Sequence, residues 1–247
     1  MNPLLGKASK KILIFGSSSL LGQGLIKDLS KANHIICIDK KIKNNQGKKN
    51  IFNYKCDVNN YSKLNKIKDK IKKKFKHIDI IINLIVEQNY STFERQSYKK
   101  FNDSLKTNVG SVFLVTKLFY KILKKSRNPQ IINLSSIYGV VSGDPKIYPT
   151  SKVTSDVYAA SKGAIIQLTK YYAVHLSKYK IRVNCVSPGG IYNFQNKTLV
   201  KNYSKKVPMK RMAKMEEITG GIKFLLSDKC NYINGHNLII DGGFTSW

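Results

Sequence analysis

Short apolar segments alternate with helical patterns along almost the whole chain, and this alternation limits the possible folds more than any other sequence feature. We interpret seven of these segments as strands, over residues 11–15, 34–38, 51–56, 79–82, 130–134, 181–186 and 237–240. Strands that alternate with helices predict an α/β fold, with a doubly wound, mostly parallel sheet and helices on both faces. No linker, low-complexity segment or internal repeat interrupts the pattern, so we expect a single domain over residues 1–247.

The intervening segments carry helical periodicity. We expect a helix from the end of the first glycine-rich turn to about residue 31, a lysine-rich helix over 63–76, a helix pair over 98–125, and helices over 156–177 and around 216–226. In the helix over 156–177, one stripe should face the core, formed by Ile165, Leu168, Tyr172 and Leu176. The polar stretch 191–208 is predicted to be a lid over a ligand site.

A glycine-rich turn, GSSSLLGQG, begins at Gly16 directly after the first predicted strand and leads into a helix. Small residues let the backbone approach a pyrophosphate, and the helix N-terminus supplies N–H donors and a partial positive charge. The second predicted strand ends in Asp39, 23 positions after Gly16, which is about where a dinucleotide-binding fold places its ribose-binding acid. An ordinary tight turn is the alternative reading of the glycines alone. The combination predicts a Rossmann-like dinucleotide site.

Other polar residues also fall at the ends of predicted strands, namely Asp57, Asn83, Ser136 and Pro188. In an open parallel sheet, ligands bind at the carboxyl ends of the strands. We therefore expect these residues and the Gly16 turn to surround one site.

Tyr158 and Lys162 are four positions apart in the helix predicted over 156–177, so they share one face. A tyrosine hydroxyl ordinarily titrates near ~10, and a neighbouring ammonium favours the phenolate and lowers that pKa. The pair is therefore a candidate acid/base device. By itself the spacing is also compatible with two residues on a solvated helix face.

The net charge is +30, from 44 Lys and Arg against 14 Asp and Glu. Such a balance suits a nucleic acid or another polyanion. Most of the excess is lysine, however, and it is spread along the chain. In the densest run, residues 63–76, apolar residues form one helical face and lysines the other. We favour a solvated helix face over a nucleic-acid site.

Composition also bears on compartment. The chain has no apolar run long enough to span a membrane and no signal-peptide pattern, so we expect a cytoplasmic protein with no membrane partner. The four cysteines are scattered and form no C-x-x-C pair, which predicts reduced, mostly buried thiols and no metal site; they are Cys37, Cys56, Cys185 and Cys230.

From about Lys11 to Trp247 the chain resembles the single-domain branch of the short-chain dehydrogenase/reductase family. The matching pieces are the Gly16 turn, Asp57-Val58, Asn83, Asn108, INLSS, YAASK, IRVNCVSPGG and YINGHNLIIDGG. The wording of SSIYGVV and GGFTSW further resembles family members encoded among surface-sugar and flagellin-modification genes. The 3-oxoacyl-carrier-protein reductases of the same family are also similar.

The resemblance implies four catalytic residues. Tyr158 corresponds to the family's proton donor and acceptor, Ser136 to the serine that hydrogen-bonds the reacting oxygen, and Lys162 to the lysine that binds the nicotinamide ribose and tunes the tyrosine. Asn108 corresponds to the asparagine that holds a relay water. The chemistry agrees, because reducing a ketone develops negative charge on oxygen and two hydroxyl donors stabilise it.

The resemblance also implies a cofactor site. Its candidate residues are Gly16, Ser18, Ser19, Leu20, Leu21, Gly22, Asp39, Lys40, Asp57, Val58, Asn83, Tyr158, Lys162, Pro188, Gly189 and Ile191. Asp39 can accept hydrogen bonds from the adenosine ribose and repels a 2′-phosphate, so we expect NAD(H) to be favoured. Lys40 and Lys41 leave NADP(H) open.

The chain departs from the family pattern in several places. Ser19 and Leu20 stand where a further glycine is usual, so we expect a looser phosphate cradle. Leu84-Ile85-Val86 replaces Asn-Ala-Gly and should crowd the adenosine side, and Asn193 stands near the usual threonine. Ser136 and Tyr158 are 22 positions apart rather than about a dozen, and we expect the extra loop, residues 143–154, to border the substrate pocket.

These observations favour an NAD(P)-dependent oxidoreductase that interconverts a secondary alcohol and a ketone on a small-molecule substrate, either a sugar derivative or a 3-oxoacyl group. One alternative is a catalytically impaired member of the fold that binds a polyanion. Another is a nucleotide-sugar epimerase or dehydratase, although the chain is short for that larger branch. The resemblance further implies a homotetramer or homodimer formed by the helices of Asn108 and Tyr158, where apolar residues cover more than one side: Val109, Val112, Phe113, Phe119 and Ile166.

Overall fold

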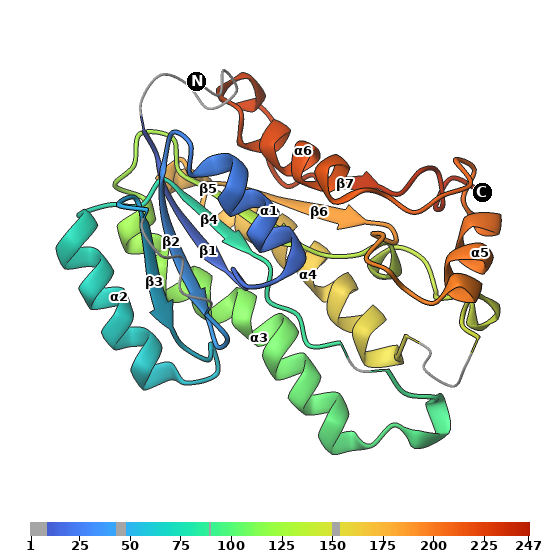
Figure 1. Ribbon diagram of the computed structural model, residues 1–247. Helices are drawn as coiled ribbons and strands as arrows, with labels where there is room; N and C mark the ends of the chain where they lie inside the picture. The colour runs from blue at the N-terminus through green and yellow to red at the C-terminus, as the bar shows by residue number, and fades with distance from the viewer. Residues whose placement is uncertain (1–8, 43–47, 89, 150–153) are drawn as a thin grey trace.

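The computed structural model describes residues 9–42, 48–88, 90–149 and 154–247. Its centre is a seven-stranded parallel sheet in the order β3-β2-β1-β4-β5-β6-β7 (Figure 1). The strands are β1 (Lys11–Phe15), β2 (His34–Asp39), β3 (Ile51–Lys55), β4 (Ile80–Asn83), β5 (Gln130–Leu134), β6 (Arg182–Pro188) and β7 (Asn237–Ile240). The predicted fold class is confirmed; the bounds of β1, β5 and β7 match the prediction, and those of the other strands differ by at most two residues at either end.

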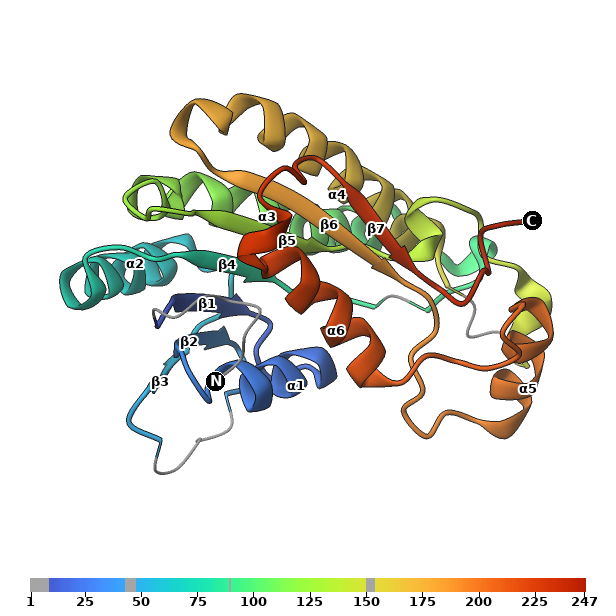
Figure 2. The same ribbon diagram turned by 90° about the horizontal axis from the view of Figure 1, so that it is seen from above.

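Helices cover both faces of this sheet, as Figure 2 shows. One face carries α1 (Leu20–Leu29) and α6 (Met215–Leu226), and the other carries α2 (Tyr61–Phe75), α3 (Tyr98–Leu123) and α4 (Asp156–His175). Side chains alternate along each strand, so Ile12 and Ile14 of β1 pack with the first pair of helices while Leu13 and Phe15 pack with the other three. Burial of strands on both faces explains their continuous apolar runs.

One prediction about helices is wrong. A single helix, α3 (Tyr98–Leu123), stands where a pair was predicted over 98–125, and Ser97 caps its start. The polar stretch 191–208 contains a helix, α5 (Lys197–Lys206), which Asn196 caps. Its apolar residues are few, and it is held by a small cluster away from the main core, which includes Tyr203 and Val207.

The lysine-rich helix α2 has the predicted amphipathic arrangement. Leu64, Ile67, Ile71 and Phe75 are buried against the sheet, and most of its lysines are exposed. The stripe predicted on α4 also faces inward, with Ile165 and Tyr172 buried and Leu168 and Leu176 partly buried. The four cysteines are buried and free, as expected.

The sheet order places a crevice where a ligand site is expected. The strand β1 lies between β2 and β4, so the chain turns in opposite directions from this point, and the carboxyl ends of β1 and β4 are the edges of the crevice. The helix α5 and the turn Pro145–Ile147 pack together beyond the carboxyl ends of β5 and β6 (Figures 1 and 2). In the described part of the chain, no helix is both long and apolar enough to cross a membrane.

Candidate active site

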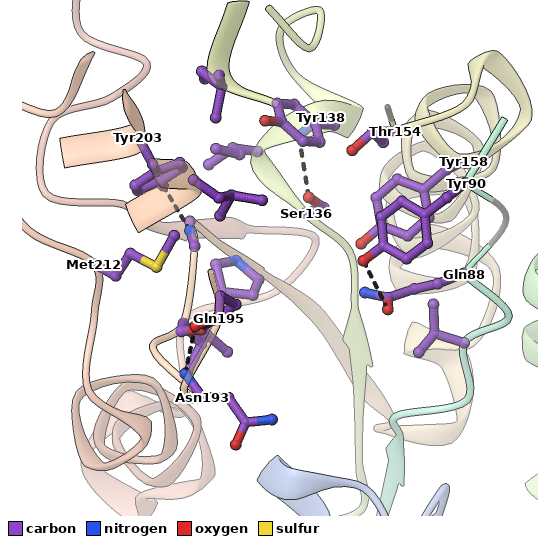
Figure 3. A pocket seen from close by; sticks show the side chains of 18 of the residues that line it. Gln88, Tyr90, Ser136, Tyr138, Thr154, Tyr158, Asn193, Gln195, Tyr203 and Met212 are labelled. Atoms are coloured by element: carbon purple, nitrogen blue, oxygen red, sulfur yellow. Dashed lines mark hydrogen bonds between the residues drawn. The ribbon is translucent and has the colours of Figure 1, made fainter. Parts of the chain in front are cut away.

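A cavity of about 670 Å³ opens at the carboxyl ends of the central strands (Figure 3). Its walls come from the end of β5, the first turns of α4, the segment after β4, the extra loop and the lid segment 191–208. Ser136, Tyr158 and Lys162 line it, so three of the four predicted catalytic residues meet in one place. Residues of the extra loop also line it, as predicted; residues 150–153 of that loop lie outside the described part of the chain.

Tyr158 is held by the start of α4. Ser155 caps this helix, and its hydroxyl accepts a 3.4 Å hydrogen bond from the backbone N–H of Tyr158. Ser136 follows β5 in extended backbone, and its hydroxyl accepts a 3.2 Å hydrogen bond from the N–H of Tyr138. Figure 3 shows the hydroxyls of Tyr158 and Ser136 facing the same space.

Burial raises the pKa of Tyr158 to about 12, a hydrogen bond with Ser136 lowers it in part, and the nearby Tyr90 and Tyr148 raise it further. The prediction that Lys162 lowers this pKa is wrong: the net shift is upward, and Lys162 is not among the groups that cause it. Desolvation of the phenolate is the largest effect, because α4 carries the ring into the wall of the cavity. Tyr158 therefore holds its proton at neutral pH.

Lys162 lies one helical turn further along α4 and is 1% exposed. Its ammonium donates a 3.0 Å hydrogen bond to the carbonyl of Leu134, and the nitrogen lies 5.5 Å from the ring centroid of Tyr158. Burial lowers the pKa of Lys162 to about 8. The turn after β5 also packs directly on this helix, since a Cβ on Gly139 would come within 2.6 Å of the Lys162 carbonyl carbon.

Asn108 is fully buried on α3, behind the cavity wall rather than in it. Its Oδ1 accepts a 2.7 Å hydrogen bond from the N–H of Glu87, and its Nδ2 donates to the Glu87 carbonyl and to the Ser161 hydroxyl, each at 3.2 Å. The amide thus joins the segment after β4 to α4. Its role in holding a relay water stays a prediction.

The Gly16 turn has the shape of a phosphate cradle. Gly16 has φ +75°, and a Cβ there would come within 2.7 Å of the Leu84 backbone. The departure at Ser19 provides a cap for α1, because its hydroxyl accepts from the N–H of Gly22 at 3.1 Å and donates to the Gly16 carbonyl at 2.7 Å. Leu20 is 41% exposed and lines the cavity with Leu21.

Asp39 lies beside this turn at the end of β2. Its Oδ2 accepts a 2.9 Å hydrogen bond from the N–H of Ser18, and its Oδ1 accepts a 2.8 Å bond from the N–H of Lys41. Lys40 and Lys41 are both exposed. The carboxylate is therefore fixed against the turn, and the lysines are not.

The remaining cofactor candidates are divided. Pro188, Gly189 and Ile191 line the cavity. Asp57 caps the turn after β3, Val58 is buried in the core, and Asn83 donates a 2.8 Å hydrogen bond to Asn133, so none of these three is among the cavity's lining residues.

The bulky segment Leu84-Ile85-Val86 fills less of the site than its sequence suggests. Leu84 is buried in the cluster shared with α1 and α6, and Ile85 packs against the cluster on the other face of the sheet. Only Val86 of the three lines the cavity. Asn193, near the position of the family's usual threonine, lines it too.

These residues fit a dinucleotide. The N–H groups of Leu20 and Leu21, at the N-terminus of α1, have no hydrogen-bond acceptor among the described residues. The Oδ1 atom of Asn83 is buried and also has no hydrogen-bond partner among the residues that the structure describes. An anion at the helix N-terminus would accept hydrogen bonds from the two N–H groups, and a ribose at the end of β2 would donate to the carboxylate of Asp39. No cluster of three or more His, Cys, Asp or Glu residues suited to a metal occurs among the described residues.

Several lining residues have no counterpart in the sequence predictions. They are mainly tyrosines and amides: Gln88, Tyr90, Tyr138, Tyr148, Gln195 and Tyr203. Tyr148 lies in the extra loop, and Gln195 and Tyr203 lie in the predicted lid, 191–208, so their segments were expected near a ligand although the residues themselves were not singled out. Gln88 and Tyr90 come from a segment that was not expected at the site, and tertiary packing brings them there.

Comparison with known proteins gives consistent matches. Residues 38–245 match a family model described as enoyl-(acyl carrier protein) reductase. The chain is 28% identical to the post-translational flagellin modification protein A of Campylobacter coli, over 96% of this chain and 98% of that protein. It is 29% identical to a 3-oxoacyl-[acyl-carrier-protein] reductase of Buchnera aphidicola, with the same two coverages. It is 28% identical to the 5-keto-D-gluconate 5-reductase of Escherichia coli, over 98% of each chain.

A solved structure is also similar. The crystal structure of a short-chain dehydrogenase from Leptospira borgpetersenii with bound NAD⁺ superposes with a TM-score of 0.90 and 34% sequence identity, over 96% of this chain and 93% of that one.

Proposed function

The chain belongs to the short-chain dehydrogenase/reductase family, and from that premise we propose that it interconverts a secondary alcohol and a ketone at the cavity of Ser136, Tyr158 and Lys162. The observation that carries the proposal is the meeting of two hydroxyls and one buried ammonium at the mouth of a dinucleotide-binding crevice. A nicotinamide dinucleotide, when bound, supplies hydride to the ketone carbon or accepts it from the alcohol.

The chain's own residues handle the oxygen and its proton. Tyr158, whose pKa is about 12, carries its proton at neutral pH and donates it to the ketone oxygen as charge develops there. Ser136 donates a hydrogen bond to the same oxygen. In the oxidative direction the phenolate of Tyr158 accepts the alcohol proton, and Lys162, by resemblance, binds the nicotinamide ribose. Asn108, on α3, hydrogen-bonds both the segment after β4 and α4 and so fixes their relative positions. By resemblance, it also binds a relay water.

For the cofactor we propose a preference for NAD(H) over NADP(H). Asp39 is fixed by two backbone N–H groups and sits where an adenosine ribose would lie against Gly16, Ser18 and Ser19. A 2′-phosphate there would face a carboxylate. Lys40 and Lys41 would have to lose side-chain entropy to reach it. A relative from Leptospira binds NAD⁺ and another solved relative, ElxO, at 27% identity binds NADP, so the proposed preference rests on Asp39.

For the substrate, we propose a ketone carried by a sugar derivative or a 3-oxoacyl group. The relatives named for 3-oxoacyl-[acyl-carrier-protein] and 5-keto-D-gluconate reduction support these two classes. Residues of the predicted lid, 191–208, which includes α5, line one side of this cavity.

We further propose that residues 1–247 form one domain that acts in the cytoplasm as a homodimer or homotetramer. The outer sides of α3 and α4 support an interface there, since Phe113 is 53% exposed and Val174 is 70% exposed. Val112 and Phe119, by contrast, belong to the core. Light scattering at micromolar concentration tests the assembly, and a monomer would refute it.

The proposed activity is tested with purified protein, NADH and a panel of ketones, with products identified by NMR. Reduction of at least one ketone to its secondary alcohol, with NADH consumed in equal amount, is expected. Calorimetry run in parallel reports cofactor binding. A protein that neither binds NADH or NADPH nor turns over any ketone would refute the proposal.

A further inference from the structure

The cavity is almost free of charged side chains, although the chain is very basic. The sequence contains 44 Lys and Arg residues, yet Lys162 is the one charged residue among the described residues that line the cavity. Its ammonium lies behind the ring of Tyr158 and is already hydrogen-bonded to the Leu134 carbonyl. A charged group on the substrate would therefore find no described partner of opposite charge exposed to it here.

Hydroxyl groups gather on one wall instead. The hydroxyl of Tyr148, from the extra loop, donates a 3.1 Å hydrogen bond to the hydroxyl of Tyr138 and forms a second hydrogen bond with the hydroxyl of Thr154. Burial raises the pKa of Tyr138, so this wall stays neutral. Figure 3 shows Tyr138 and Thr154 on the same side of the cavity as Ser136.

The rim after β4 adds a second polar pair. The hydroxyl of Tyr90 donates a 3.0 Å hydrogen bond to Oε1 of Gln88, and both side chains line the cavity. In Figure 3 the hydroxyls of Tyr90 and Tyr158 point into the same space. Apolar side chains of the small cluster beside α5 also line the cavity, among them Ile147, Leu199 and Met212, and Tyr138 and Tyr148 pack against the same cluster.

We propose that the cavity takes an uncharged polyhydroxylated ketone, a neutral keto-sugar, and that the hydroxyl of Tyr148 helps to select it. This inference rests on the proposed function and narrows it. A keto-sugar has hydroxyls that can hydrogen-bond the tyrosine hydroxyls and C–H groups that can pack on the apolar side chains, so it matches both parts of the lining. An acyl chain would cover these hydroxyls without using their remaining hydrogen-bonding capacity, and a carboxylate would lose water while the one described cation at the cavity, Lys162, is already bonded to the Leu134 carbonyl.

The first test compares ketones that differ only in charge. L-sorbose carries a hydroxymethyl group where 5-keto-D-gluconate carries its carboxylate, and D-fructose stands in the same relation to 2-keto-D-gluconate. Both pairs, a neutral acetoacetyl thioester and cyclohexanone are assayed with NADH, and their dissociation constants from the protein–NADH complex are measured by calorimetry. We expect the neutral sugar of each pair to be bound and reduced at least about tenfold better than its acid.

The outcomes separate the two proposals. If a keto-acid equals or exceeds its neutral partner, or if the thioester is the only ketone bound and reduced, the neutral-sugar inference is overturned while the oxidoreductase function stands. If no ketone is bound or reduced and NADH does not bind, the proposed function itself fails.

The second test isolates the hydroxyl of Tyr148. Tyr148→Phe keeps the ring and removes the hydroxyl; we expect about a tenfold rise in KM for L-sorbose and little change for cyclohexanone. Tyr171→Phe is the matched control, because Tyr171 stacks on His175 on the outer side of α4 and is not among the cavity's lining residues. Thermal unfolding confirms that each variant is folded. An unchanged ratio of the two KM values in Tyr148→Phe would remove this residue from substrate selection.

Discussion

The ammonium of Lys162 lies 5.5 Å from the ring centroid of Tyr158 and donates its hydrogen bond to the backbone carbonyl of Leu134, at 3.0 Å. The helical spacing of the two residues brings them onto one face, and the end of β5 supplies the acceptor. A buried ammonium with a neutral partner is costly, and a buried phenol is hard to ionise. Burial therefore keeps Tyr158 protonated, as the proposed reduction of a ketone requires of its acid, while it favours the neutral form of Lys162.

Replacing the proton donor is the most direct test of the site. In Tyr158→Phe the ring remains, so cofactor binding should persist, while turnover should fall by about 10²–10⁴-fold because the transferable proton is gone. NADH affinity by calorimetry and kcat on the best ketone provide the two readouts. Retention of more than half the activity would exclude Tyr158 as the acid/base.

The buried ammonium should reduce stability at neutral pH. The pKa of Lys162 falls from an ordinary 10.5 to about 8, so the unfolded chain binds more protons than the folded one between these two values. The resulting penalty is full below about pH 8 and disappears as the pH rises toward the unfolded pKa. Lys162→Met, which removes the charge, should raise the free energy of unfolding at pH 7 by about 1–3 kcal/mol and abolish activity.

Urea unfolding between pH 7 and pH 10 checks this prediction. The stability of the unmodified protein should rise relative to that of Lys162→Met as the pH increases, so the difference between their free energies of unfolding should narrow. The comparison is made between the two proteins, because burial raises the pKa of Cys37, Cys185, Tyr158 and Tyr203 in both, and deprotonation of these groups in the unfolded chain favours unfolding at the alkaline end. Lys170→Met, at an exposed position on the same helix, serves as the control. Equal slopes for Lys162→Met and the unmodified protein would contradict the argument.

Cofactor choice should depend on the charge of Asp39. We expect NADH to bind at least tenfold more tightly than NADPH, or about 1.4 kcal/mol. Asp39→Ala should narrow this ratio, but it also removes the acceptor for the N–H groups of Ser18 and Lys41. Asp39→Asn separates the two effects, since it removes the charge and keeps an acceptor. Equal affinities of the unmodified protein for NADH and NADPH would contradict this prediction and would indicate that Lys40 and Lys41 offset the repulsion of the 2′-phosphate by Asp39.

An ion pair links the extra loop, residues 143–154, to the helix α5. Lys206 of α5 lies 2.8 Å from the carboxylate of Asp144, and Nδ2 of Asn202 donates to the carbonyls of Lys146 and Ile147 at 3.3 and 3.4 Å. The ammonium of Lys206 holds the pKa of Asp144 below its usual range. Asp144→Asn and Lys206→Met should each raise KM by about two- to threefold without changing kcat, because partly exposed ion pairs contribute little.

The double variant should behave like either single variant, and the effect should shrink in high salt. Lys201→Met, on an exposed position of the same helix, provides the control. If the increase in KM of the double variant equals the combined increases of the two single variants, the two residues act separately, and the extra loop and α5 are not coupled through this pair.

The main features of the fold followed from local sequence patterns. Apolar runs bounded by polar residues marked the strands, and helical spacing put Tyr158 beside Lys162 and turned the lysines of α2 to solvent. The turn at Gly16 was recognisable because a positive φ and a close backbone approach both favour glycine. The helix α5 was missed because its residues are mostly polar, and its packing partners lie in the distant segment 137–148.

The chemistry of the site was settled by residues far apart in the sequence. The raised pKa of Tyr158 depends on its burial and on Tyr90 and Tyr148, which reach it from two different loops. The position of Asn108 behind the cavity depends on how α3 packs against α4. Periodicity and turn preferences are properties of neighbouring residues, so the sequence by itself determined the order of strands and helices and the candidate acid/base pair. Desolvation and the grouping of hydroxyls depend on which surfaces meet in space, and only the tertiary structure decided them.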